Sequence, residues 1–267
     1  MLDIKRLPSW EAFEGEIQSL FEKVKSKRSK TQLPVSTPMF RGLAAESWCL
    51  TTTLERYSNK AYPVEEYYKI MRGIKPGLES FMEKRWTLES EFTSIDNPHN
   101  PPQGYPFMIY LRHHGFPSPL LDWTTSPYVA AFFAFESKPP TEEENVAIYS
   151  YLGYWGDTKS GSTHVISTIG SYVTTNRRHH IQQCRYTFAM KQLNNKHVYC
   201  NHEEALAQGS VTVQNVLTKY LIPSTERAKV LSKLDLMNIN AYSLFGDEEN
   251  LMKLLAYREI QNPTIPY

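Results

Sequence analysis

Cysteine is scarce in this chain, and the spacing of the few that occur excludes two kinds of protein. Cys49, Cys184 and Cys200 are odd in number and contain no C-x-x-C pair. Disulfide-stapled folds and zinc ribbons both need paired cysteines, so neither is indicated. His197 and His202 flank Cys200, but no second pair of ligands accompanies them, and we predict no metal site. This cysteine usage is typical of a protein that stays in a reducing cytoplasm.

Long apolar runs and an excess of one charge are missing as well. The longest apolar stretch, YVAAFFAF, is far too short to cross a bilayer, and the opening residues MLDIKRLPSWEAFEGE carry charges where a signal peptide has an apolar core. Lysine and arginine total 29 against 28 aspartates and glutamates, a formal net charge of +1. The overall charge therefore calls for no polyanionic partner by itself, and we expect a cytoplasmic protein without a membrane partner.

The common nucleotide and metalloprotease motifs are also absent. The chain contains no G-x-x-x-x-G-K-[ST], no G-x-G-x-x-G and no H-E-x-x-H. A P-loop, a dinucleotide-binding fold of the Rossmann type and a zincin are therefore not indicated. Any nucleotide site in this protein must be built in another way.

What the chain does contain is enough apolar sequence for a packed core, with 41% hydrophobic and 13% aromatic residues. Ser9 is placed to cap a helix that runs to about Lys25, because apolar residues recur at helical spacing from Trp10 onward. The basic run KVKSKRSK suits the C-terminal end of that helix. We take residues 1–30 as an N-terminal helix with a basic segment and residues 31–267 as one domain.

The remaining pattern predicts helices in the N-terminal half and strands in the C-terminal half, which is an α+β class. Residues 64–92 read as helix with a break at Pro76 and Gly77, since proline removes a backbone donor. The expected strands are 35–41, 146–153, 164–173, 185–193 and 211–222, and the other expected helices are 107–113, one that starts at Pro127, 225–234 and 248–257.

The densest group of polar residues lies in RHHGFPSPLLDWTTSPYVAAFFA, between a helix end and a helix start. The free N–H groups of a helix that begins after Ser126 can hold an anion or a phosphate. In the alternative interpretation, Asp122 and the hydroxyls only cap that helix and a histidine bonds a nearby carbonyl. The candidate binding residues of this stretch are His113, His114, Asp122, Thr124, Thr125 and Ser126.

A second group, NRRHHIQQCRYTFAMK, mixes cations with aromatic rings. Cations bind phosphates and aromatic rings stack on bases, so this block predicts contact with a single-stranded nucleic acid and favours RNA or DNA over protein as the acceptor. The alternative is an ordinary solvated strand edge. The candidate nucleic-acid-binding residues are Arg177, Arg178, Arg185 and Tyr186.

Five blocks in succession resemble the FRG-domain family, which takes its name from the Phe-Arg-Gly motif present here at residues 40–42. They are SWEAFEGEIQSL, MFRGLAAESWCLTTTLER, LRHHGFPSPLLDWTTSPYVAAFFA, RHHIQQCRYTFAM and LIPSTERAKVLSKLDLMNINAYSLF, and they span roughly Ser9 to Phe245. Leu43, Arg112, Pro119 and Cys184 depart from the family pattern. Leu43 and Pro119 replace polar residues, so the contacts made there in the family are not expected here.

The order of these blocks resembles the ADP-ribosyltransferase fold, with a split β-sheet core flanked by helices. The resemblance implies NAD as a substrate and no metal, with Arg41 matching the first motif, Thr124 to Ser126 the second, and Gln182 the third. It implies catalytic roles for Arg41, Ser126 and Gln182, and NAD contacts from Arg41, Gly42 and the candidate binding residues of the polar stretch. The planar Arg41 cation can grip the pyrophosphate or ribose beside Gly42. A carboxylate is needed for the developing oxocarbenium ion, and Asp122, Glu203 and Glu204 are candidates.

Three functions remain open at this point. The first is an NAD-dependent ADP-ribosyltransferase that modifies a macromolecule such as RNA. The resemblance implies an effector of toxin–antitoxin or anti-phage systems, with an inhibitory partner protein. The second is a module that binds a nucleotide or nucleic acid without chemistry. The third is a metal-independent phosphoesterase that uses His113, His114 and Asp122 on RNA, although no nucleophile accompanies them.

Overall fold

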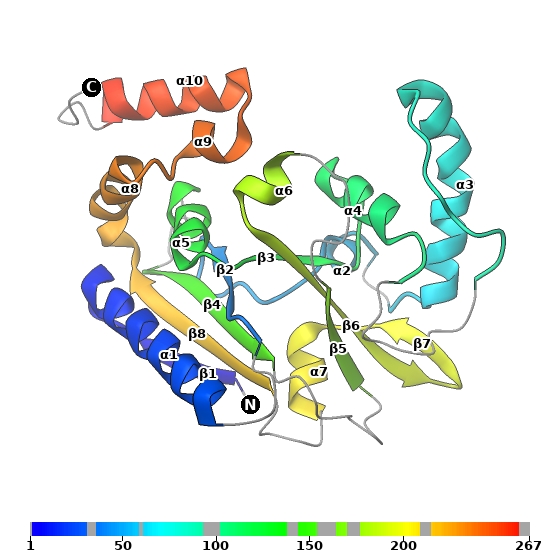
Figure 1. Ribbon diagram of the computed structural model, residues 1–267, viewed down its shortest axis with the longest axis horizontal. Helices are drawn as coiled ribbons and strands as arrows, with labels where there is room; N and C mark the ends of the chain where they lie inside the picture. The colour runs from blue at the N-terminus through cyan, green and yellow to red at the C-terminus, as the bar shows by residue number, and fades with distance from the viewer. Residues whose placement is uncertain are drawn as a thin grey trace.

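A single mixed β-sheet of eight strands forms the centre of the protein. The computed structural model describes residues 2–30, 36–58, 61–92, 102–137, 144–153, 164–169, 177–208 and 215–261. The strands follow the order β1-β8-β4-β2-β3-β6-β5, and β7 pairs with β6 outside this path (Figure 1). Only β1 and β8 run parallel among the described pairs. The strands are β1 (Leu2–Arg6), β2 (Met39–Leu43), β3 (Leu121–Thr124), β4 (Asn145–Gly153), β5 (His164–Ile169), β6 (Cys184–Leu193), β7 (Lys196–Tyr199) and β8 (Asn215–Pro223).

The sheet consists of two parts that meet at β2 and β3. On one side β2 pairs with β4 over five residues, Met39 to Leu43, and on the other side β3 pairs with β6 over four, Leu121 to Thr124. Between β2 and β3 themselves, the described register contains the single pair Phe40–Thr124. The two parts are therefore joined at one point and separate on either side of it.

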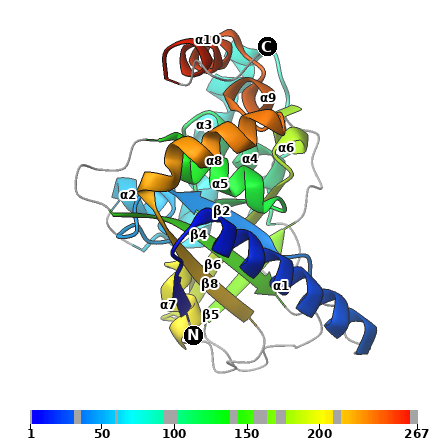
Figure 2. The same ribbon diagram turned by 90° about the vertical axis from the view of Figure 1, so that its left-hand side faces the viewer.

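Ten helices and two short helical turns surround this sheet within the described residues. Figure 2 shows α9 and α10 at the end of the molecule opposite the N-terminus, with α8 next to α5. The helices are α1 (Trp10–Lys30), α2 (Thr53–Ser58), α3 (Val64–Met82), α4 (Tyr105–His113), α5 (Pro127–Glu136), α6 (Arg177–Ile181), α7 (His202–Gln208), α8 (Arg227–Leu236), α9 (Ala241–Phe245) and α10 (Glu248–Ala256), and the turns are a 3-10 turn at Ser224–Glu226 and a π turn at Tyr257–Gln261.

Helix α5 is the central helix of the main core. It packs on β2 and β4 and carries α8 on its other side, while α1 lies along β8 (Figure 1). The sequence PYVAAFFAFE is apolar on every side, as expected for a helix buried between a sheet and other helices. Trp10 and Phe13 of α1 are completely buried against this core, with ring centroids 5.2 Å apart. The first thirty residues therefore share one core with the rest of the chain.

Two further cores lie around β6 and under β4. The α3 and α4 helices pack aromatic rings such as Tyr67 and Phe107 against Tyr186 of β6. The α7 side of the sheet buries Trp123, Tyr149 and their neighbours. Helices α4 and α7 lie on different sides of the sheet at β6 and β3. Side chains of these two strands therefore face either the core under α3 and α4 or the core under α7.

The mixed α/β class is confirmed, whereas the expected division into a helical half and a β-rich half is not. Strands β2 and β3 come from the first half and lie at the centre of the sheet, and α6 to α10 come from the second half.

The predicted break at Pro76 is wrong, because α3 continues through it to Met82. Pro76 lies on the exposed side, where water can solvate the carbonyl that loses its N–H partner. No described helix has the length and apolar character of a membrane span.

Candidate functional site

Arg41 reaches from one part of the sheet to the other. It lies on β2, and its Nη1 donates a 2.6 Å hydrogen bond to the main-chain carbonyl of Asp122 on β3, 81 residues away. Its Nε is buried and has no partner among the described residues. Burial lowers the pKa of Arg41 to about 10; the nearby Asp122 opposes this, while Arg112 and Arg56 add to it. A buried guanidinium with an unused donor is a candidate ligand-binding group.

Asp122 is held by a second arginine. Arg112, at the end of α4, contacts both carboxylate oxygens, with Nη2–Oδ2 at 2.6 Å and Nε–Oδ1 at 3.3 Å. Burial raises the pKa of Asp122, but the charges of Arg112 and Arg41 outweigh it, so the pKa is lowered overall. A third guanidinium, Arg56, is close enough for its charge to act on Arg41 and Arg112. Glu55 also acts on Arg56, so the group holds three cations and two carboxylates, and the remaining excess of positive charge suits an anion.

Gly42 makes room for a helix, and not for a ligand as the sequence suggested. A Cβ atom on Gly42 would lie 1.9 Å from the carbonyl oxygen of Ala130 and 2.7 Å from the amide nitrogen of Ala134. Both atoms belong to the main chain of α5, so no side chain can move aside. The glycine of the Phe-Arg-Gly motif thus lets α5 lie directly on β2, while Arg41 points to the opposite face.

The hydroxyls of the Thr-Thr-Ser stretch act mainly within the loop before α5. Ser126 caps this helix, since its Oγ accepts from the amide of Val129 at 3.3 Å. Thr124 Oγ1 accepts from the amide of Ser126 at 3.0 Å. Thr125 Oγ1 donates to Oε1 of Gln183 at 2.7 Å, which ties this loop to the residue before β6. The Ser126 contact is the capping role of the alternative interpretation, whereas Thr125 bonds Gln183 and Asp122 pairs with Arg112.

The Phe-Arg-Gly motif, the aspartate and the α5 cap are now placed in one continuous segment. Residues 36–143 match the family model of the FRG domain. This match is narrower than the resemblance from Ser9 to Phe245, and it contains β2, α2, α3, α4, β3 and α5. No curated protein and no solved structure matches the chain.

Gln182 lies beyond the matched FRG-domain segment, and its side chain is occupied by neighbours. Its Nε2 donates to the carbonyl of Leu244 in α9 at 3.0 Å, and its Oε1 accepts from Sγ of Cys184 at 3.7 Å. The side chain is almost completely buried. Neither contact is to Arg41 or Ser126, so the described contacts hold Gln182 to α9 and β6.

His113 belongs to a hydrogen-bonded network that the sequence did not reveal. Its Nε2 lies 2.8 Å from the hydroxyl of Tyr186, and Nδ1 of His179 lies 3.0 Å from the same hydroxyl. Tyr186 is completely buried, and the buried Nε2 of His179 has no partner among the described residues. Burial lowers the pKa of His113, and it lowers the pKa of His179 to about 4. The two rings are therefore neutral near pH 7.

The expected nucleic-acid residues do not form one exposed surface. The ring of Tyr186 is enclosed, so it offers no face to a base. Arg185 Nη1 donates to the carbonyl of Cys184 at 2.9 Å, and the side chain of Arg177 lies outside the described part of the structure. Arg178 forms an ion pair with Asp247 and donates from Nε to the carbonyl of Phe245 at 3.1 Å.

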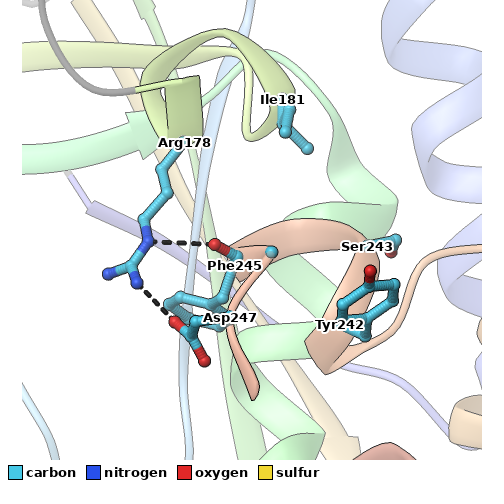
Figure 3. A pocket seen from close by; sticks show the side chains of 7 residues that line it. Arg178, Ile181, Tyr242, Ser243, Phe245 and Asp247 are labelled. Carbon is cyan, nitrogen blue, oxygen red and sulfur yellow. Dashed lines mark hydrogen bonds and ion pairs between the residues drawn. The ribbon is translucent and has the colours of Figure 1, made fainter. Parts of the chain in front are cut away.

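Arg178 also lines a pocket of about 420 Å³ between α6 and α9 (Figure 3). Its guanidinium lies over the ring of Phe245, 5.4 Å from the centroid. The hydroxyl of Ser243 is hydrogen-bonded to the carbonyl of Asn240 in the capping box of α9. The polar groups of the pocket are thus bonded mainly to one another, which identifies it as the junction of two helices. The remaining lining residues are Ile181, Tyr242 and Gly246.

Of the three candidate carboxylates, Glu203 is the one whose described hydrogen-bond partners are uncharged. Its Oε1 accepts from the amide of Leu50 and from the hydroxyl of Tyr149, each at 3.2 Å. Tyr149 is the register partner of Arg41, so the two side chains lie on the same face of the sheet. Asp122 is paired with Arg112, and Glu204 lies 2.7 Å from the ammonium of Lys191.

His202, next to Glu203, is a second residue to which the sequence, having excluded a metal site, assigned no role. Its Nε2 lies 2.8 Å from Thr187 Oγ1, which also accepts from the indole N–H of Trp123 at 2.8 Å. Burial, followed by the charge of Arg41, lowers the pKa of His202 to about 3. This dependence on Arg41 places His202 on the Arg41 side of the sheet. An isolated histidine at the start of a short helix carries no sequence signal for such a position.

Proposed function

We propose that this chain is an NAD-dependent ADP-ribosyltransferase that modifies a macromolecule, with RNA as the acceptor. The supporting observation is Arg41, a buried cation with an unused Nε, located where the two parts of the sheet are joined by one register pair. Arg56 and Arg112 add positive charge at the same place. A dinucleotide pyrophosphate carries the negative charge and the acceptor oxygens that these groups require.

The reaction breaks one bond and forms another. The bond between C1′ of the ribose and the nicotinamide nitrogen breaks, and nicotinamide leaves with the electron pair. A nucleophilic atom of the acceptor then bonds to C1′ and releases its proton to solvent. In this proposal Arg41 and Arg56 hold the pyrophosphate, while Arg112 keeps Asp122 ionised and in place. Positive charge develops on the ribose, so a carboxylate nearby lowers the barrier.

Glu203 is our choice for this carboxylate. It lies on the Arg41 face of the sheet through Tyr149, and its described hydrogen-bond donors are a neutral hydroxyl and an amide. Asp122 is less suitable because the charge of Arg112 already compensates it. Gln182 is also less suitable, since its amide is bonded to α9.

A binding module without chemistry is the second candidate. It is favoured by the same two observations, because Gln182 is the residue that the resemblance assigned to the third catalytic motif and Asp122 is one of the three candidate carboxylates. In this case the arginine cluster binds a nucleotide and no transfer follows. The setting proposed for either function is a toxin or an anti-phage effector restrained by an inhibitor protein.

Calorimetric titration with NAD, followed by incubation with NAD labelled in its adenylate part, tests the proposal. The wild-type chain is expected to bind NAD and to transfer label to cellular RNA. Arg41→Ala should abolish both, whereas Arg72→Ala, which changes an exposed arginine of α3, should change neither. Binding without transfer to RNA or protein supports the module. If the folded wild type does not bind NAD, both the transferase and a module that binds NAD without chemistry are contradicted.

A further inference from the structure

Four side chains form a ladder on the outer side of α4, in which neighbouring rings pack in tilted contacts. The rings of Trp86 and Tyr110 have centroids 4.6 Å apart, and Tyr110 and His114 follow at 4.2 Å with an interplanar angle of 38°. The ammonium of Lys84 lies over two of these rings, 5.4 Å from the centroid of Trp86 and 5.1 Å from that of Tyr110. The ladder joins the chain after α3 to the last turn of α4.

The inner end of the ladder is rigidly held and the outer end is open. Trp86 is only 8% exposed and packs on Phe107 at 4.9 Å between centroids. Its amide donates a 2.7 Å hydrogen bond to Glu79, which Lys75 also contacts. His114, by contrast, is exposed. The next residue is Gly115, and a Cβ atom there would meet no atom within 4 Å. The chain position next to His114 is therefore open to solvent.

We propose that this ladder is a stacking platform for a base of single-stranded nucleic acid, with the base on the outer face of His114. Every nucleobase has a flat π surface, and stacking on a protein ring is worth about 1–3 kcal/mol per base. Arg85 supplies a cation for the backbone: its Nη1 lies 3.9 Å from Glu79, but its side chain is 90% exposed, so a phosphate can reach the guanidinium. An exposed ring backed by two further rings loses little conformational entropy when a base is added.

The position of the ladder connects it to the proposed transfer site. His114 lies two residues after Arg112, which holds Asp122 and contributes to the arginine cluster. A strand whose base stacks on His114 is thereby brought to the C-terminal end of α4, the helix that also supplies Arg112 to the cluster. The inference rests on the proposed function for the choice of RNA as the acceptor. It moves the nucleic-acid contact from the Tyr186 region, where the ring is buried, to α4.

Fluorescence anisotropy with end-labelled oligouridylate and oligoadenylate of about 12 nucleotides tests the platform in the absence of NAD. The whole chain is expected to bind both, and His114→Ala should weaken binding about 5- to 100-fold. His114→Phe should retain binding because it keeps a ring on Tyr110. The matched control is His197→Ala, which removes an exposed histidine of β7 and should have no effect.

Two results would overturn the platform. One is equal affinity of His114→Ala and wild type, with both proteins shown to be folded by circular dichroism. The other is absence of binding by the wild type at low salt, where phosphate contacts are strongest. Unlabelled NAD is added last, and displacement of the oligonucleotide by NAD would mean that the ladder holds a base of the dinucleotide instead. Because transfer is not measured, failure of the proposed enzymatic activity leaves this result unaffected.

Discussion

The main chain of Gly42 lies against the carbonyl of Ala130 so closely that a Cβ atom would stand 1.9 Å from that oxygen. Gly42→Ala must therefore push α5 away from β2, and we expect a loss of about 3 kcal/mol in the free energy of unfolding. Urea denaturation measures it. Gly15→Ala is the control: it changes a helical glycine of α1 with nothing within 4 Å, and should raise stability by about 0.5–1 kcal/mol. Equal stability of Gly42→Ala and wild type would contradict this packing.

The Arg112–Asp122 ion pair predicts a specific response to acid. The pKa of Asp122 is lower in the folded protein than its unfolded value of about 3.9, so the pair stabilises the fold above that pH and loses its effect as the pH falls through the folded pKa. We expect wild type to be more stable than Asp122→Asn at pH 7 and the difference to shrink below about pH 4. Glu249→Gln, which breaks an exposed pair with Lys253, is the control and should have little effect. A difference that is independent of pH would argue against the pair.

The buried ring of His179 predicts a second pH dependence, in a different range. Its pKa is about 4 in the folded state and about 6.5 in the unfolded chain, so the unfolded state takes up the proton first as the pH falls. Stability should therefore decline between about pH 6.5 and 4, with a contribution from this ring of up to about 1.4 kcal/mol per pH unit. His179→Gln should reduce that slope, measured by urea denaturation across the range. His180→Gln, which alters the exposed neighbouring ring, is the comparison; an unchanged slope in His179→Gln would contradict the assignment.

Thiol alkylation should distinguish the three cysteines. Cys49 is exposed, whereas Cys184 and Cys200 are buried and burial raises the pKa of each to about 12. We expect iodoacetamide to modify Cys49 alone in the native protein, and slowly, since burial of its sulfur and the charge of Glu203 raise its pKa too. Peptide mass spectrometry locates the label, and urea-unfolded protein provides the control with all three modified. Early labelling of Cys184 would show that the core around β6 opens readily.

Several helices could be predicted because their signals are local. The apolar spacing from Trp10 and the Ser9 cap indicated α1, and Ser9 Oγ does accept from the amide of Ala12 at 3.4 Å. Pro127 and the Ser126 cap indicated α5 in the same way. The break at Pro76 failed because a proline on an exposed side costs only one hydrogen bond to solvent-accessible backbone. Strands β1, β3 and β7 were missed: β1 and β7 are short edge strands with little apolar alternation, and β3 spans only Leu121–Thr124.

The candidate site was partly accessible from the order of the family motifs. That order placed Arg41 and Asp122 in one site, and the structure brings them within 2.6 Å through the main chain of Asp122. It could not reveal that Arg112 holds the carboxylate or that Glu203 lies beside Tyr149, because these contacts join α4 to β3 and α7 to β4. It also could not show that Tyr186 is enclosed between two histidines.

The sequence by itself determined the mixed α/β class, the Phe-Arg-Gly segment and the helices whose caps and apolar spacing lie within a few residues of one another. Only the tertiary structure decided what the functional side chains do. Gly42 accommodates α5 instead of a ligand, and Tyr186 is buried in a network instead of exposed to a base. The reason is physical: capping and periodicity depend on neighbouring residues, whereas burial and charge pairing depend on strands and helices that meet only after the chain has folded.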